Sequence, residues 1–487
     1  MEYPSLLWQA GLQTEERLFP KDNSGRITPV PGSISVTTIE DLLPKKAFCD
    51  TSAAFFRHPC TGDEIRDRQK LLWTLSHDDE ALGRLEAWTD ALGQFEQLLR
   101  RWQSPTSTEY AHALLFPAVA KAYGDLVEQG VSAIPDVSGQ TAKVRAFFTD
   151  LRAEPEMRTL RQEIDAFQAR WPQNVRLEIG GTSPLAEGIA DSHREKLRQI
   201  FVDMGIGELC PTLRAHMAEP DTIDAYGTAY PDVLVGARRL LDTYETLLLV
   251  TYAMEQMLSY RIELMFLREA AVYVRHMEEM GYPMCLPKVA KERTIHLRSL
   301  RDVSLAAREL CGNAVVPNDV DLTGDSHFCY VTGANGGGKT TYLRSVGIAV
   351  LFFLAGCPVS AKDGEIFCFR RLCTHFPSEE DFTDSGRFVD EVRRADEIRA
   401  VADPDTVVLC NETFSGTDEE KSERYSRALA EDMADCGAFG LYVTHIHSLT
   451  HGRIPTLAAV VDETDENRRT YRIRRMDGTD SPLPWIF

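Results

Sequence analysis

The sequence predicts a chain of class α + α/β, in which a helical region is followed by a domain built on a mostly parallel sheet. Two observations along its 487 residues predict this class. Residues 59–284 carry long amphipathic stretches and few strand signals. From residue 285 onward, short apolar runs alternate with helical patterns, as they do where parallel strands are joined by crossover helices. A chain of this length has room for a core in each part.

Amphipathic stretches predict a series of helices in the first part: residues 62–76, 78–103, 107–128, 141–171 and 192–204. A longer stretch lies between Pro231 and Pro283, where no proline interrupts the pattern. It predicts one helix that could reach ~75 Å at about 1.5 Å per residue. Val250, Met254 and Met257 recur along it at helical spacing, so we expect them in the core.

Two segments of the first part are predicted to be connections. Residues 172–231 are rich in glycine and proline, so we expect them to join helices without a core of their own. Residues 1–58 are expected to be an N-terminal lead-in, and they lack the pattern of a secretory signal, which predicts a cytoplasmic chain. The longest apolar run, residues 346–361, is shorter than the ~20 residues of a membrane span, so no membrane contact is expected.

Three apolar runs predict strands in the second part: FCYVT at residues 328–332, TVVLC at 406–410 and GLYVTH at 440–445. Helical patterns begin after the first two of them, at Thr340 and at Asp418. The order strand, helix, strand, helix, strand is typical of a parallel sheet covered by helices.

A glycine-rich loop joins the first of these strands to the first helix, and residues 333–340 match the pattern GxxxxGK[ST]. Its glycines allow backbone amides to converge on phosphate oxygens, and the helix N-terminus adds its positive dipole end. Lys339 can reach the β- and γ-phosphates, and the Thr340 hydroxyl can hold Mg²⁺. The predicted phosphate contacts are Gly333, Ala334, Asn335, Gly336, Gly337, Gly338, Lys339, Thr340 and Thr341.

Polar residues at the ends of the other two strands predict the rest of a phosphate-transfer site. Glu412 is the predicted general base for water, because a carboxylate at a strand end beside the phosphates can accept a proton; the alternative is a surface carboxylate in a turn. Asn411 stands where Asp is ordinarily found, so weaker Mg²⁺ binding by Thr340 and Asn411 is expected. His445, after Thr444, is predicted either to face the γ-phosphate or to be a solvated loop residue.

The charge of the chain bears on nucleic-acid binding. Fifty-three Lys and Arg residues against 74 Asp and Glu leave a net charge of −21, which would repel nucleic acid unless basic groups are locally concentrated. The strongest local concentration is RRTYRIRR, which includes Arg468, Arg472 and Arg474. This run is predicted either to be a solvated hairpin edge or to contact DNA phosphates.

These motifs, taken in order, resemble the ATPase domain of the MutS family of DNA mismatch-repair proteins. An Asn318-Asp319 pair precedes the loop, GANGGGKTT is similar to the family's GPNMGGKST, and Asn411-Glu412 stands for its Asp-Glu strand end. Gly416-Thr417 and Thr444-His445 match the residues that follow in the family. The segment at 379–398 resembles the one in which a serine reaches the γ-phosphate across a dimer, and Ser385 is the candidate.

The resemblance implies an ABC-type phosphate-loop ATPase domain at residues 285–487 and a helical core and lever domain at 59–284, with a reduced clamp near 172–231. It implies Mg-ATP as the ligand, slow hydrolysis using Glu412 and His445, a homodimer through the ATPase domain, and local or weak DNA contact with repair proteins as further partners. We expect no mismatch-reading domain with its wedge, because the lever-like region starts by about residue 59. The alternative is a nucleotide-gated interaction protein that grips a protein partner and hydrolyses little, because Asn411 replaces Asp.

Overall fold

The computed structural model describes two compact units that interleave along the chain. Unit 1 comprises residues 1–13 and 80–264, and unit 2 comprises residues 14–79 and 265–487. The boundary between them falls within helix α11 (Tyr260–Glu279). The structure describes residues 2–9, 11–12, 18–19, 41–44, 47–105, 109–170, 176–180, 183–187, 213–216, 231–308, 311–377, 384–414, 418–461 and 469–476.

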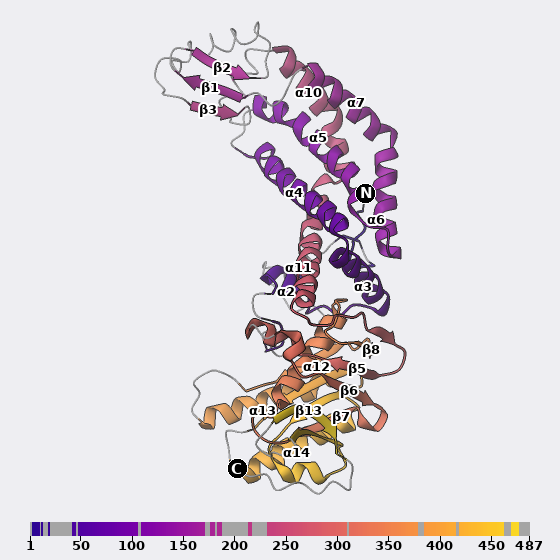
Figure 1. The fold of residues 1–487 in the computed structure, drawn as a ribbon. Coiled ribbons are helices and arrows are strands. Elements are labelled where there is room, and N and C mark those ends of the chain that lie inside the picture. The colour runs from indigo at the N-terminus through magenta and orange to yellow at the C-terminus, as the bar shows by residue number, and fades with distance from the viewer. Residues whose placement is uncertain are drawn as a thin grey trace. The chain divides into compact units, whose positions relative to one another are not determined.

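Unit 1 is a layered set of helices, as the amphipathic pattern predicts (Figure 1). The predicted helix at 141–171 is two helices, because Glu154 leaves the helical conformation and Pro155 begins the next helix without needing an amide donor. The helices are α4 (Asp79–Trp102), α5 (Glu109–Ala133), α6 (Gly139–Ala153), α7 (Pro155–Arg170) and α10 (Pro231–Thr246).

The prediction of one uninterrupted helix between Pro231 and Pro283 is wrong. After α10 the chain forms a π-helical turn at Leu247–Thr251 and a 3₁₀ turn at Met254–Ser259 before α11 begins. Between these turns Ala253 adopts a left-handed conformation with φ 48°. Nothing in the local sequence marks this break, since neither glycine nor proline is present.

Tertiary packing explains the break. Met254 and Met257 are fully buried as predicted, whereas Val250 is 70% exposed, so the three do not form one stripe. The tyrosines on either side of the break enter aromatic contacts: Tyr252 lies against Tyr123 at 6.4 Å, and Tyr260 lies against Trp88 at 5.3 Å, between ring centroids. The helix is therefore interrupted where two of its tyrosines enter aromatic contacts with other helices of unit 1.

The N-terminal residues are part of unit 1's core instead of a separate lead-in. Glu263 of α11 is fully buried and accepts hydrogen bonds from the Ser5 hydroxyl at 2.5 Å and the Leu6 amide at 2.7 Å. The side-chain amide of Gln140 donates to the carbonyl oxygens of Ser5 and Trp8. These bonds satisfy polar groups that burial would otherwise penalise.

The region expected to contain only connections includes strands. Residues 176–180, 183–187 and 213–216 form an antiparallel sheet of order β2-β1-β3, with β1 (Arg176–Gly180) in the centre, β2 (Ser183–Glu187) and β3 (Leu213–His216). The helix predicted at 192–204 lies outside the described residues.

Unit 2 contains the predicted α/β domain, whose main sheet has the order β13-β12-β7-β11-β10-β9. All neighbouring strands are parallel except β12 and β13, which form an antiparallel pair at one edge. The mostly parallel character is therefore as predicted. The strands are β7 (Phe328–Thr332), β9 (Arg371–His375), β10 (Thr406–Asn411), β11 (Phe439–Val443), β12 (Thr456–Val461) and β13 (Arg469–Arg475).

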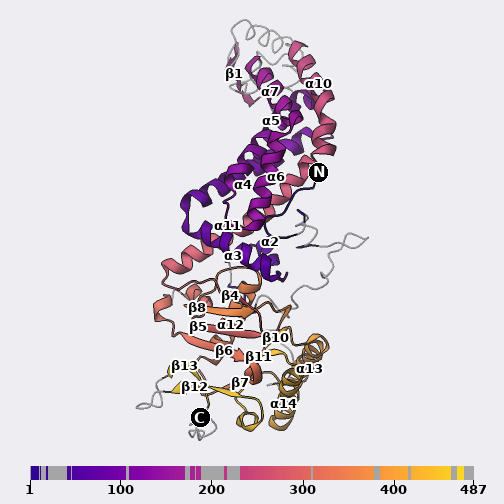
Figure 2. The ribbon, with the colours of Figure 1, turned by 90° about the vertical axis from the view of Figure 1, so that its right-hand side faces the viewer.

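Helices cover both faces of this sheet. On one face, α13 (Asp384–Val401) and α14 (Glu419–Asp435) lie next to each other and share a core with β7, β9, β10 and β11 (Figure 2). On the other face, α12 (Lys339–Leu354) packs so closely that a Cβ on Gly347 would lie 2.6 Å from the Leu409 side chain. Every residue of β7 and β11 is buried, which explains their continuous apolar runs.

A second sheet and two N-terminal helices complete unit 2, and neither was assigned to this unit from sequence. The sheet has the order β4-β8-β5-β6 and is mostly antiparallel. Arg68 donates to the carbonyl oxygen of Ala355 and Gln69 to that of Pro287, which ties α3 to this unit. The elements are α2 (Asp50–Phe55), α3 (Gly62–His77), β4 (Lys288–Ala290), β5 (Thr294–Leu300), β6 (Asn318–Thr323) and β8 (Asp363–Phe367).

Short 3₁₀ turns link several of these elements, at Val303–Arg308, Gly312–Ala314, Gly324–Ser326 and His447–His451. None of the helices in the described part of the chain is long and apolar enough to cross a membrane.

A histidine at the end of β9 lies inside the core of unit 2. His375 is 1% exposed, and its Nε2 donates to the Glu391 carbonyl oxygen at 2.8 Å. Its Nδ1 has no hydrogen-bond partner among the described residues. Burial lowers the pKa of His375 from 6.5 to about 4, and the charge of Arg394 acts in the same direction.

This shift predicts acid sensitivity of unit 2. The folded-state pKa is depressed, so the stabilising contribution is present above the ordinary pKa of 6.5 and is lost as pH falls through about 4. Between about pH 7 and about pH 5, the free energy of unfolding should fall by about 2 kcal/mol from this residue. In urea unfolding, the variant His375→Gln, whose side chain retains a hydrogen-bond donor, should not show this decrease in the free energy of unfolding. A His451→Gln control at an exposed position should keep it, and equal pH dependence in all three proteins would contradict the assignment.

Candidate nucleotide-binding site

The glycine-rich loop follows the central, fully buried strand β7 and leads into α12. Gly333, Gly336 and Gly338 have φ values of 127°, 70° and 91°, which side chains disfavour. A Cβ on Gly333 would also lie 2.9 Å from the Cβ of Ala459 in β12, so this position is doubly restricted to glycine. The local sequence therefore folds into a tight turn at the start of α12. The first amides of this helix have no hydrogen-bond partners within the helix, so they are free to bind an anion at the turn.

Lys339 is the first residue of α12 and is only 4% exposed. Its Nζ donates to the carbonyl oxygens of Gly333 at 2.8 Å and Ala334 at 3.3 Å. Burial lowers the pKa of Lys339 below its ordinary value, while the negative charge of Glu412 opposes that shift. The ammonium group is thus held over the loop by the carbonyl oxygens of the loop itself.

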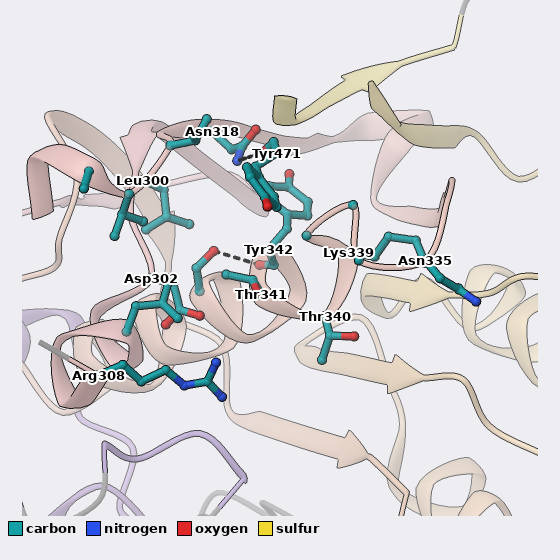
Figure 3. A pocket seen from close by; sticks show the side chains of 18 of the residues that line it. Leu300, Asp302, Arg308, Asn318, Asn335, Lys339, Thr340, Thr341, Tyr342 and Tyr471 are labelled. Carbon is teal, nitrogen blue, oxygen red and sulfur yellow. Dashed lines mark hydrogen bonds between the residues drawn. The ribbon is translucent and has the colours of Figure 1, made fainter. Parts of the chain in front are cut away.

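A cavity of about 500 Å³ opens beside the loop. Figure 3 shows Asn335 and Lys339 on one side of it and Asp302 and Arg308 on the other. Apolar side chains occupy much of the lining away from the loop, as is usual for ligand pockets. The lining residues are Leu300, Asp302, Leu305, Arg308, Ala314, Val315, Val316, Asn318, Asn335, Gly336, Gly337, Gly338, Lys339, Thr340, Thr341, Tyr342, Ser345, Glu412 and Tyr471.

The structure brings the end of β10 to the start of α12. The Thr340 hydroxyl donates to the side-chain oxygen of Asn411 at 3.1 Å. Glu412 follows Asn411 directly, lines the same cavity and has a φ of 48°. Parallel strands β7 and β10 end at the same edge of the sheet, which is why residues 71 positions apart meet here.

The antiparallel edge of the main sheet supplies a wall of the cavity that sequence reasoning missed. Tyr471 of β13 has a φ of 57° beside a register shift in the β12–β13 pairing, and its ring atom Cδ1 would lie 3.4 Å from a Cβ on Gly338. Asn318 holds this irregular strand: its Nδ2 donates to the Tyr471 carbonyl oxygen at 3.0 Å, and its Oδ1 accepts from the Ile473 amide at 2.7 Å. The isolated RRTYRIRR run gave no signal for a bulge.

Asp302 was also missed. It is 2% exposed, one carboxylate oxygen accepts from the Ser304 amide at 2.8 Å, and the other has no hydrogen-bond partner in the described part of the chain. Burial raises the pKa of Asp302, whereas Arg344 and Arg308 oppose that shift. An acceptor in this wall of the cavity can select ligands that present a donor.

Several predicted residues lie apart from the cavity or cannot be described. His445 follows β11 and is exposed, and it does not line the cavity. Ser385 is the second residue of α13. Arg472 and Arg474 are exposed on β13, at the sheet edge predicted for them. Arg468, Gly416 and Thr417 lie outside the described residues.

The donor set at the loop fits a magnesium nucleotide better than an independent protein metal site. The described residues contain no group of three or more His, Cys, Asp or Glu side chains that could hold a metal. Thr340 and Asn411 instead offer two uncharged oxygens beside the amides of the loop. Mg²⁺ commonly takes few protein ligands and completes its shell with phosphate oxygens and water.

A strand, a glycine loop with a buried lysine, and a helix, on a parallel sheet with a second acidic strand end, define a phosphate-loop domain. Residues 329–471 match the model of MutS domain V, so this region of the chain is similar to that domain of the MutS family. The match begins in β7 and ends in β13, so it includes the loop, Asn411, Glu412 and Tyr471. The resemblance to the MutS family is thus confirmed for this region of the chain.

Curated relatives agree with this placement. An "Endonuclease MutS2" of Solidesulfovibrio magneticus is 32% identical over 167 residues, which cover 34% of this chain and 21% of the relative. A "DNA mismatch repair protein MutS" of Shouchella clausii is 28% identical over 176 residues, 36% of this chain and 20% of the relative. The "DNA mismatch repair protein MSH2" of Saccharomyces cerevisiae is 32% identical over 162 residues, 33% of this chain and 17% of the relative. The chain therefore matches about a fifth of each relative's length.

Proposed function

We propose that unit 2 binds Mg-ATP in the cavity beside the loop and hydrolyses it slowly. The observation that carries this proposal is the convergence of Lys339, Thr340 and Glu412 on one cavity, with the Thr340 hydroxyl bonded to Asn411. A cation, a hydroxyl and a carboxylate at these places are the parts that phosphoryl transfer to water requires. The match of residues 329–471 to MutS domain V supports ATP as the nucleotide.

Each residue has a distinct task in the proposed reaction. The loop amides and Lys339 bind and orient the β- and γ-phosphates. Glu412 accepts a proton from the attacking water at its carboxylate oxygen. Bound Mg²⁺ would neutralise charge that develops on the phosphates. Thr340 and Asn411 would hold that ion, and Asn411 supplies no charge of its own, which accounts for the slow rate we propose.

We further propose that the chain acts on DNA as a homodimer, in mismatch repair or a related processing of DNA structure. Two of the relatives are named as DNA mismatch repair proteins and one as an endonuclease. Ser385 at the start of α13 would contact the nucleotide of the second copy. The net charge of −21 implies that any DNA grip is local or weak, with Arg468, Arg472 and Arg474 as phosphate contacts.

A second candidate function rests on Asn411. An amide in place of a carboxylate lowers the negative charge at the metal, so the nucleotide could act as a switch that is bound but little hydrolysed. The helices of unit 1 would then bind a protein instead of DNA, and this binding would depend on the nucleotide state.

Steady-state phosphate release tests the proposed hydrolysis. Replacing Glu412 with alanine removes the proton acceptor, so the turnover number should fall by roughly 100-fold while ATP binding remains. A Glu420→Ala variant on the exposed start of α14 is the matched control and should turn over normally. Equal rates near background in the wild type and Glu412→Ala would instead favour the switch.

The magnesium dependence tests the role of Asn411. Asn411→Asp adds a full negative charge beside Thr340, so the Mg²⁺ concentration for half-maximal ATP binding should fall several-fold, by about 3-fold or more. This decrease in the Mg²⁺ requirement should vanish with Thr340→Val, because valine removes the hydroxyl group and keeps the shape of the side chain. An unchanged magnesium requirement in Asn411→Asp would place the ion elsewhere.

Binding to branched, mismatched and matched duplexes with ATP present tests the DNA proposal. Affinity should fall steeply with salt, and replacing Arg472 and Arg474 with alanine should lower the salt slope by about one for each contact removed. Arg298→Ala, which removes an exposed arginine paired with Asp363, should leave the slope unchanged. Absence of binding to every duplex at low salt would remove DNA from the proposal.

A further inference from the structure

The cavity beside the glycine loop has a polar side and an apolar wall. The loop amides, Lys339 and Thr340 form the polar side, which the proposed function assigns to the phosphates. A flat base can bury its faces against apolar side chains, whereas a charged phosphate cannot. A nucleotide whose phosphates lie on the loop therefore places its base against the apolar wall. The aliphatic side chains of that wall are Leu300, Leu305, Ala314, Val315 and Val316.

Asp302 is the buried acid of this wall. Its side chain lines the cavity and is drawn between Leu300 and Arg308 in Figure 3, although the residue is only 2% exposed. The amide of Arg301, the preceding residue, donates to the Ser360 carbonyl oxygen at 3.0 Å. The Ser304 amide donates to the Asp302 oxygen Oδ1 at 2.8 Å. The carboxylate is therefore fixed from the protein side through one of its two oxygens.

The second carboxylate oxygen of Asp302 distinguishes it from the other polar groups of the cavity. Lys339, Asn318 and Ser345 all use their side-chain polar atoms in hydrogen bonds within the protein. In the part of the chain that the structure describes, Oδ2 of Asp302 is the one buried side-chain polar atom of the lining that has no partner. A buried carboxylate oxygen costs free energy until a donor reaches it, and a donor on a bound ligand can do so.

A single free acceptor discriminates among the donors that a nucleotide carries. Adenine presents one exocyclic amino group. Guanine presents two adjacent donors, which pair best with both oxygens of a carboxylate, and here the Ser304 amide already occupies one of them. The ribose hydroxyls are also donors, but a polar ribose would lose its other hydrogen bonds against an apolar wall. The free oxygen of Asp302 therefore suits the amino group of adenine.

We propose that Asp302 selects adenine: its free carboxylate oxygen accepts a hydrogen bond from the exocyclic amino group of the base while the phosphates lie on the glycine loop. This inference rests on the proposed function, since it concerns the base of the nucleotide bound in the same cavity. Asp302 acts in binding and takes no part in proton transfer, so its effect falls on the relative affinities of different nucleotides.

Equilibrium binding of triphosphates to the wild-type chain with Mg²⁺ tests the selection. ATP carries the amino group, purine riboside triphosphate has a hydrogen in its place, and inosine triphosphate has a carbonyl oxygen there. ATP should bind roughly 10- to 100-fold more tightly than either analogue, because the analogues lose a hydrogen bond to a charged group. The 2′-deoxy and 3′-deoxy forms of ATP keep the amino group and should bind like ATP. A loss confined to the deoxy forms would assign the free oxygen to the ribose and overturn the proposal.

The variant Asp302→Asn tests the residue itself with little change of shape. Its side-chain oxygen can accept from the Ser304 amide, and its amino group then faces the cavity as a donor. The preference should reverse, so that inosine triphosphate binds more tightly than ATP, by roughly 10-fold. Asp325→Asn changes an exposed aspartate in another 3₁₀ turn of unit 2 and should keep the wild-type preference. An unchanged preference in Asp302→Asn would overturn the selection of adenine.

Binding of inorganic triphosphate separates this inference from misfolding and from the proposed function. This anion can occupy the glycine loop without a base, so the wild type and Asp302→Asn should bind it equally. Weaker binding of it by Asp302→Asn would indicate a structural role and overturn the selection. A wild type that binds neither ATP nor inorganic triphosphate would overturn the proposed function as well. A wild type that binds ATP and purine riboside triphosphate equally would remove only the role of Asp302.

Discussion

The burial of strands β7, β10 and β11 between two layers of helices is the constraint on which the candidate site depends. Parallel strands that are covered on both faces must end at a common edge, and their connections must leave from that edge. The glycine loop, the Asn411-Glu412 pair and Thr444 all follow these strands. A hydrogen bond between Thr340 and Asn411 is the direct consequence, since it joins two strand ends that are distant in sequence.

Backbone strain is concentrated around the same edge. Glu412, Phe414 and Tyr471 are non-glycine residues in left-handed conformations, and two of them line the cavity beside the glycine loop. Two of them are supported by groups from other elements: Phe414 by the rings of His375, Phe388 and Tyr425, and Tyr471 by hydrogen bonds that Asn318 makes along its strand. A strained backbone conformation persists only where the surrounding structure enforces it. The rigid helices and sheet therefore hold the loops of the site in one conformation.

The loop and the strands were predictable because their signals are local. A run of apolar residues buried on both faces has a distinct pattern, and GANGGGKT contains the glycines that its own backbone conformation requires. The supports were not predictable. Nothing near Asn318 indicates its hydrogen bonds along β13, and nothing in RRTYRIRR indicates that Tyr471 would turn toward Gly338. The break at Ala253 and the strands at 176–187 escaped notice for the same reason, since their causes lie in distant contacts.

The sequence by itself determined the class of the second part, the position of its phosphate loop and the identity of the residues that follow each strand, because each depends on short-range pattern and on backbone chemistry. The tertiary structure alone decided which of those residues share a cavity, where the long helical run is interrupted, and which buried groups hold the strained loops. Those outcomes depend on packing between elements far apart along the chain, where burial of apolar surface outweighs local propensity.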